Sequence, residues 1–123
     1  MDRSNLKNIG YFGENYVCDF LQRNNYSIIK KNFTIRGGEI DIIAKKNNII
    51  AFVEVKTRMP DSLVSGEDSI TYSKKKNIIK TARRFISTLK GNFIFRFDVA
   101  IVEADNDKVI NLKYYAGAFD ASK

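Results

Sequence analysis

The sequence predicts one α/β domain, of the α+β kind with a mixed sheet, in the order helix, strand, strand, strand, helix, strand, strand. Two stretches carry apolar residues at helical spacing, from about residue 4 to Arg23 and from about Ser73 to Lys90. The stretches between and after them are shorter and rich in Ile, Val and Phe, which is typical of strands. A chain of 123 residues has room for a single hydrophobic core, so we expect one domain over residues 1–123.

The first predicted helix has an apolar stripe with a carboxylate at its edge. At about 100° per residue, Glu14 lies beside that stripe, where a helix can lend a carboxylate to a site on the sheet. Gly13 lies in the same helix, although glycine in a helix interior costs about 1 kcal/mol relative to alanine. Close packing, or close approach to a ligand, would explain this glycine. The second helix is expected to end at Gly91.

Five strands are expected, and two of them form a hairpin. Gly37-Gly38 permits a positive φ and a close backbone approach just before the hairpin. The polar cluster Lys45-Lys46-Asn47-Asn48 separates the two hairpin arms. The strands are predicted at Tyr26–Phe33, Gly38–Ile43, Ile49–Val53 with Glu54 to Arg58 continuing it, Phe93–Val102 and Val109–Tyr115.

Charged residues lie inside this otherwise apolar hairpin. Because side chains alternate across a strand, Glu54 and Lys56 share one face of the second arm. If Lys45 pairs with Ile50, Asp41 of the first arm lies directly opposite Glu54. A one-residue shift of this register would send the two carboxylates to opposite faces. The hypothesis of a site on the hairpin therefore depends on the register.

Two carboxylates held opposite each other oppose folding unless something compensates their charge. A divalent cation does so, because Mg²⁺ and Mn²⁺ take carboxylate and water oxygens and leave coordination positions for phosphate. The chain has no histidine and a single cysteine, Cys18, which excludes the usual zinc sites. We therefore predict a Mg²⁺ or Mn²⁺ site at Asp41 and Glu54. Lys56 beside it could stabilise negative charge on a phosphoryl group or help to orient the attacking water.

The chain is basic, with a net charge of +7, which favours nucleic acid or an anionic surface as a partner. Its basic residues gather on the second predicted helix. Most of them lie outside the apolar stripe and suit phosphate contacts, whereas Lys74 lies one turn before Ile78 and points toward the sheet. The helix residues concerned are Lys74, Lys75, Lys76, Lys80, Arg83 and Arg84.

Two further features bear on location. No apolar run approaches membrane-spanning length. The N-terminus lacks the layout of a secretory signal. We therefore expect a cytoplasmic protein without a membrane partner.

On these residues the chain resembles the YraN-like family of uncharacterised bacterial proteins and, behind it, the PD-(D/E)xK nuclease superfamily with its restriction-endonuclease-like fold. It is also similar to archaeal Holliday-junction resolvases in size and in combining a helix glutamate, an aspartate and an E-x-K pair. Ile40 stands where the literal motif has proline, and Thr34 where the family often has arginine. The matching segments are Gly13-Glu14, Lys31-Asn32, Gly38-Glu39-Ile40-Asp41, Phe52 to Arg58, Lys74 and Arg96-Phe97-Asp98-Val99.

The resemblance implies a role for each acidic residue. Asp41 and Glu54 would bind Mg²⁺ or Mn²⁺, Glu14 would complete the acidic cluster, and Glu39 would support it. Lys56 would be catalytic. Among the basic residues, Arg58 at the end of the E-x-K strand would join the helix residues above in binding nucleic acid.

The function expected is a metal-dependent endonuclease that hydrolyses DNA phosphodiesters, structure-selective or not sequence-specific, because the chain is too short for a separate sequence-reading domain. DNA, branched or single-stranded forms included, is the expected partner. Resolvase-like proteins act as symmetric dimers, so a homodimer is considered too. Two alternatives stay open: a nucleic-acid-binding module that keeps the nuclease fold without catalysis, and a protein-interaction domain whose acidic cluster is structural.

Overall fold

The computed structural model describes residues 3–59, 70–105 and 108–121, with side chains from Phe12 onward. Two helices and five strands follow one another in the predicted order, which confirms the predicted fold class. The elements are α1 (Arg3–Arg23), β1 (Ser27–Ile35), β2 (Gly38–Lys46), β3 (Ile49–Arg58), α2 (Tyr72–Ile86), β4 (Ile94–Asp105) and β5 (Lys108–Phe119).

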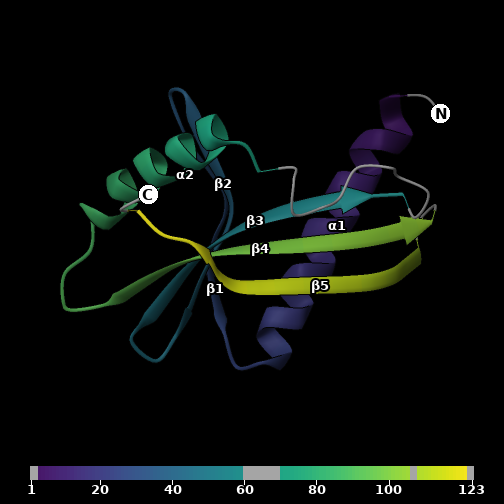
Figure 1. Ribbon diagram of the computed structural model, residues 1–123. Coiled ribbons are helices and arrows are strands. Elements are labelled where there is room, and N and C mark those ends of the chain that lie inside the picture. The colour runs from purple at the N-terminus through teal and green to yellow at the C-terminus, as the bar shows by residue number, and fades with distance from the viewer. Residues whose placement is uncertain (1–2, 60–69, 106–107, 122–123) are drawn as a thin grey trace.

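The strands form one mixed sheet in the order β1-β2-β3-β4-β5. Only β3 and β4 pair in parallel among these strands, and α2 lies in the connection between them, as a parallel pair requires. Figure 1 shows α1 crossing the sheet behind β3, β4 and β5, and α2 beside the start of β2. The sheet is therefore placed between the two helices.

Each helix packs on its own apolar cluster, one on each face of the sheet. In β3, Ala51 and Val53 belong to the cluster under α1, whereas Ile50 and Phe52 belong to the cluster under α2. This is the period-two alternation of a strand that is buried on both faces. Aromatic side chains dominate the α2 side, where the Phe52 and Phe97 rings stack with centroids 5.5 Å apart.

The β2–β3 hairpin has the register that the sequence predicted. Lys45 pairs with Ile50, and the ladder continues as far as the pair Ile42 and Val53. A two-residue turn joins the strands, and its first residue, Asn47, has a φ of 53°. Asparagine tolerates this left-handed conformation better than most residues. The turn chemistry and the hydrophobic pattern thus agree on one register.

The largest differences from the predicted element ends are at the C-terminal ends of α2 and β5. Helix α2 ends at Ile86, before the expected Lys90, because the Ser87 and Thr88 hydroxyls bond to the carbonyls of Arg84 and Phe85. Strand β5 continues to Phe119, although the sequence beyond Tyr115 has no strand pattern. Pairing with β4 extends it there, across a register shift between Phe97 and Val99.

Glycines allow each helix to lie directly on a strand. A Cβ at Gly13 of α1 would collide with the hydroxyl of Thr57 in β3, which confirms close packing as the reason for this glycine. A Cβ at Gly38 would collide with the hydroxyl of Thr81 in α2 and lie 3.2 Å from the carbonyl oxygen of Asn77. Gly38 therefore brings the start of β2 against α2.

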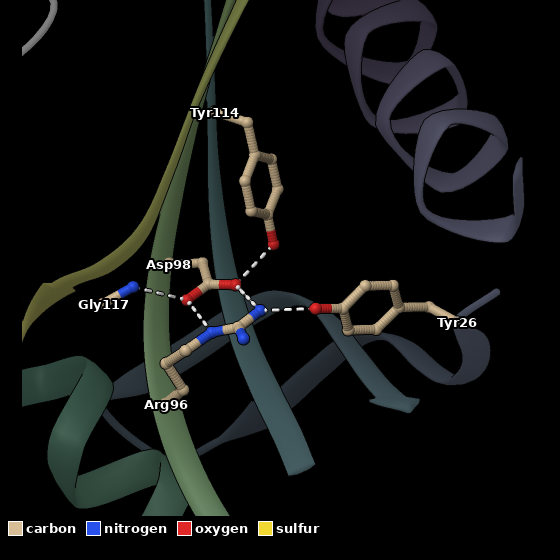
Figure 2. A network of polar contacts seen from close by, with 5 residues as sticks. All are labelled: Tyr26, Arg96, Asp98, Tyr114 and Gly117. Carbon is tan, nitrogen blue, oxygen red and sulfur yellow. Dashed lines mark hydrogen bonds and ion pairs between the residues drawn. The ribbon is translucent and has the colours of Figure 1, made fainter. Parts of the chain in front are cut away.

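A buried carboxylate joins the two strands at the C-terminal side of the sheet to the start of β1 (Figure 2). Asp98 is 0% exposed and accepts two 2.8 Å bonds from the Arg96 guanidinium. It also accepts bonds from the Tyr114 hydroxyl at 2.5 Å and from the Gly117 amide at 2.9 Å. Arg96 donates in turn to the Tyr26 hydroxyl at 2.7 Å. Both Asp98 oxygens are thus satisfied, as a buried charge requires.

The network raises the pKa of two of its side chains, Tyr114 and Arg96. Burial, and then the negative charge of Asp98, raises the pKa of Tyr114 well above its usual range. The hydrogen bond to Asp98 raises the pKa of Arg96, although burial opposes this shift. The two side chains therefore keep their protons, and the network remains intact over the ordinary pH range.

The described part of the chain contains no helix both long enough and apolar enough to span a bilayer.

Candidate active site

A cavity of about 300 Å³ lies where α2 begins over the β2–β3 hairpin. The strands supply acidic side chains to its wall, and the first turns of α2 supply a lysine and small polar groups. The lining residues are Gly38, Glu39, Asp41, Glu54, Thr71, Ser73, Lys74, Asn77 and Ile78. Asp41 and Glu54 thus share the wall of one cavity, as the same-face prediction requires, although the β2–β3 ladder ends one pair before the predicted direct pairing of the two residues.

Asp41 lies where β2 and β3 part. The ladder ends at the pair Ile42 and Val53, and the Asp41 carboxylate accepts a 2.8 Å bond from the backbone amide of Val55. A side chain thus replaces the missing ladder bond. Burial, and then the charge of Glu54, raises the pKa of Asp41 to about 8, although the Val55 bond opposes the shift. The two carboxylates are therefore not fully compensated by the groups around them.

Glu54 is 5% exposed and forms an ion pair with Lys74, whose Nζ lies 2.7 Å from Glu54 Oε1. Thr71 caps α2 by accepting a 3.1 Å bond from the Lys74 amide, and this cap fixes where the lysine leaves the helix. Burial is the largest single influence and disfavours the Lys74 ammonium, but the hydrogen bond and charge of Glu54, the hydrogen bond with Lys56 and the charge of Asp41 together outweigh it and raise the pKa of Lys74. The prediction that Lys74 points toward the sheet is confirmed.

Lys56 follows Glu54 by two residues in β3 and is part-buried beside Lys74. Burial, and then the hydrogen bond and charge of Lys74, lowers the pKa of Lys56. Glu54 and Asp41 oppose this change but do not cancel it. Lys56 therefore loses its proton at a lower pH than an ordinary surface lysine does.

The two remaining acidic residues lie further out. Glu39 is exposed at the cavity wall, whereas Glu14 of α1 does not line the cavity. Burial raises the pKa of Glu14, a hydrogen bond with Asn32 opposes this, and Glu39 adds to it. Its Oε1 is buried without a hydrogen-bond partner among the described residues.

An ion at this site would have few protein ligands. Over residues 3–59, 70–105 and 108–121, no three Asp, Glu or Cys side chains lie close enough together to hold one. Asp41 and Glu54 still fit Mg²⁺ or Mn²⁺, since Mg²⁺ is commonly bound by one or two carboxylates and completed by water and phosphate oxygens. Burial, and then the charge of Glu54, disfavours the ionised form of Asp41, and a bound cation would oppose both causes by favouring the carboxylate.

The basic residues predicted to bind nucleic acid separate into groups. Lys74 lies in the cavity, and Lys75 lies on the β5 side of α2, with its Nζ 5.6 Å from the Phe119 ring centroid. Arg58 approaches Glu103 of β4 at 3.9 Å. Exposed positions on α2 carry Lys76, Lys80, Arg83 and Arg84. The structure therefore does not gather all the predicted cations on one surface.

Sequence reasoning missed the polar residues that α2 contributes. Thr71, Ser73 and Asn77 line the cavity, but the helix was expected to begin at Ser73. A threonine three residues before Lys74 is the kind of N-cap signal that could have identified Thr71.

Fold and site together define a mixed α/β domain with an acidic cavity flanked by lysines. The chain belongs to the uncharacterised protein family UPF0102, whose sequence profile matches residues 13–102, in agreement with the predicted YraN-like resemblance. A UPF0102 protein of Clostridium perfringens strain SM101 is 46% identical over 94 residues, which cover 76% of this chain and 77% of that protein. A UPF0102 protein of Caldicellulosiruptor bescii is 43% identical over 103 residues, covering 82% of this chain and 87% of that protein.

Proposed function

We propose that this chain is a Mg²⁺- or Mn²⁺-dependent endonuclease of the PD-(D/E)xK superfamily that hydrolyses DNA phosphodiesters. One observation carries the proposal: Asp41 and Glu54 line one cavity, and Lys74 and Lys56 lie beside them. We place the activity in the cytoplasm, where DNA would be the substrate in structure-selective or non-sequence-specific cleavage. Dimerisation stays a prediction.

Asp41 and Glu54 would hold the ion, with Glu14 as an outer acidic group. When bound, such an ion polarises a phosphoryl oxygen and lowers the pKa of a bound water. Lys56 has a lowered pKa, so its amine would release or take up a proton beside the attacking water more readily than an ordinary lysine would. As an ammonium it would stabilise the negative charge that develops on the phosphoryl oxygens.

Lys74 has a second part in this scheme. Its ammonium now neutralises Glu54, so it stands in for a cation in the chain alone. An ion bound by Glu54 would compete for the same carboxylate oxygens, and Lys74 would then be available to a substrate phosphate. Lys74 would thus bind nucleic acid, as predicted from the sequence, only after an ion has taken its place at Glu54.

The raised pKa of Asp41 predicts how stability depends on pH. The folded pKa, about 8, exceeds the ordinary value of 3.8, so the folded chain holds this proton more tightly than the unfolded chain. Stability is full below the unfolded value and is lost as pH rises toward about 8. We expect the melting temperature to fall over this range without metal, and to fall less in Asp41→Asn.

Added Mg²⁺ should reverse this loss, because a ligand that binds only the folded state stabilises it. Melting curves at about pH 8 with Mg²⁺ or chelator, for wild type and Asp41→Asn, measure both effects. Asp19→Asn, at an exposed carboxylate of α1, is the matched control and should respond like wild type. Equal Mg²⁺ stabilisation of wild type and Asp41→Asn would remove Asp41 from the metal site.

The exposed cations of α2 predict the salt dependence of duplex binding. The affinity should fall with salt at a log–log slope of about −0.9 for each phosphate neutralised. Replacing Lys80 and Arg84 by alanine should therefore flatten the slope by roughly 2. The control removes the exposed Arg23 and Lys30, which lie outside α2, and should leave the slope as in wild type. Equal flattening in both double variants would assign the effect to net charge alone.

One observation favours a second function, a nucleic-acid-binding module without catalysis: Glu14 lies outside the cavity, so the acidic cluster is incomplete among the described residues. Incubation with linear, single-stranded and four-way-junction DNA, each with Mg²⁺, Mn²⁺ or chelator, separates the two functions. Metal-dependent cleavage that Glu54→Gln abolishes supports the nuclease. Binding of any of these DNAs without cleavage under all conditions supports the module.

A further inference from the structure

A second and larger hollow lies on the opposite flank of α2 from the acidic cavity. It is a groove of about 840 Å³ between α2 and the end of β5, with Tyr72, Lys75 and Arg83 on the helix side and Phe95 and Phe119 on the sheet side. In Figure 1 the C-terminal end of the chain runs back toward α2, and this return forms the second wall. The roles described above do not use this groove.

The groove combines aromatic rings with cations. Tyr72 is 68% exposed at the edge of the groove with Lys76 Nζ 5.4 Å from its ring centroid, and Phe119 stacks on Phe97 with ring centroids 5.0 Å apart. Lys75 is held above the Phe119 ring, and Arg83 is exposed at the rim. The wall therefore offers apolar ring surface with positive charge along one side.

The negative charge along the groove is smaller. Asp120 is the one carboxylate among the described lining residues, and Arg96, also part of the lining, is already neutralised by Asp98. The helix side, with Lys75 and Arg83, keeps a positive balance. A ligand that fits this wall would carry negative charge and have flat, apolar faces.

Unpaired nucleotides have this chemistry. Their bases stack on aromatic side chains whatever the sequence, and their phosphates follow a positively charged groove. In an intact duplex the bases are stacked on one another, so their faces cannot reach the rings. An acidic peptide would use the cations but would leave the exposed part of the Tyr72 ring uncovered.

The groove and the acidic cavity share the first turns of α2. Thr71, Ser73 and Lys74 line the cavity, whereas Tyr72 and Lys75 line the groove. The two hollows are thus separated by one helix, which is about 10 Å across. A strand that crosses the start of α2 would reach both.

We propose that this groove binds an unpaired segment of a nucleic acid, with a base stacked against Tyr72 and phosphates at Lys75 and Arg83. The inference rests on the proposed function for the choice of nucleic acid, and it narrows the substrate class to DNA with single-stranded segments. Cleavage would then be directed to junctions between paired and unpaired DNA, since the acidic cavity lies on the far side of α2.

Fluorescence can test the stacking directly, because the chain contains no tryptophan. Tyr72→Trp places a single indole at the groove, and titration with oligo(dT) in chelator should quench its emission to saturation. A blunt hairpin duplex should not. Tyr16→Trp, at another exposed tyrosine, lies on α1 and serves as the matched control, whose emission should stay unchanged.

Affinity gives an independent measure. Tyr72→Ala should weaken binding of oligo(dT) about ten-fold, within the range for one base stacked on an aromatic ring, and should leave duplex affinity unchanged. Tyr72→Phe keeps the ring and should bind oligo(dT) as wild type does. Circular dichroism confirms that both variants fold.

Three results would overturn the inference: no quenching of Tyr72→Trp, equal quenching of Tyr16→Trp, or an emission change on concentrating Tyr72→Trp without DNA, which would assign the groove to a second copy of the chain. The chelator keeps this test separate from catalysis. Quenching without cleavage in the Mg²⁺ assay would remove the nuclease and leave the groove. Cleavage without quenching would support the nuclease and rule out base stacking in the groove.

Discussion

Replacing Lys56 by methionine is expected to leave a folded protein that still binds DNA but cleaves it at least about 100-fold more slowly. Lys56 lies beside Lys74 and two residues from Glu54, where negative charge would build up on the phosphoryl group. A group that acts mainly on the transition state changes turnover far more than affinity. Methionine keeps most of the packing of the lysine stem while removing the charge.

Single-turnover cleavage and DNA affinity, measured on the same preparation, distinguish the two effects. Lys45→Met is the matched control: Lys45 is also a part-buried lysine of the sheet, but it lies at the turn end of β2 with its Nζ 6.0 Å from the Phe93 ring centroid, whereas Lys56 lies beside Lys74. This control should cleave as wild type does. Wild-type rates from a folded Lys56→Met protein would rule out the assigned role. Lost affinity with unchanged turnover of bound DNA would make Lys56 a phosphate anchor.

Asp98→Ala is expected to lower the free energy of unfolding by about 3–5 kcal/mol, a large share of the roughly 5–15 kcal/mol of a typical domain. The change leaves the Arg96 guanidinium, the Tyr114 hydroxyl and the Gly117 amide without their acceptor. Urea unfolding followed by circular dichroism measures the loss.

Two further variants make this prediction specific. Tyr114→Phe removes one hydrogen bond and keeps the ring, so it should lose only about 1–2 kcal/mol. Asp19→Ala removes an exposed carboxylate of α1 and should change stability by less than about 0.5 kcal/mol. If Asp98→Ala also lowered the free energy of unfolding by less than about 0.5 kcal/mol, the buried network would make no net contribution to stability. Its role would then be to fix which strand segments lie together.

The sequence was sufficient for the hairpin because its signals are local. Apolar residues dominate both arms, and a two-residue Asn-Asn turn joins them, so the turn sets the register. Lys45 pairs with Ile50 as predicted, and Asp41 and Glu54 reach the same cavity. Helix phase likewise directed Lys74 toward the sheet.

Contacts between distant segments could not be predicted in the same way. No pattern in β2 or β3 indicates that the ladder ends at Ile42, which is what lets Asp41 bond to the amide of Val55. Alternation places Arg96 and Asp98 on one face of the predicted strand Phe93–Val102, but it does not indicate which residues they contact. Their partners come from other strands and have no sequence signal that links them.

The parallel pairing of β3 with β4 also orders the events of folding. The β1–β2 and β2–β3 pairings join neighbours in the chain, and isolated hairpins form in about 1–10 μs. Pairing Ile49 with Ile94 must wait until the long connection that contains α2 has closed. We therefore expect Asp41 and Glu54 to meet before Lys74 arrives, and the closing of this connection to be the rate-limiting step of refolding.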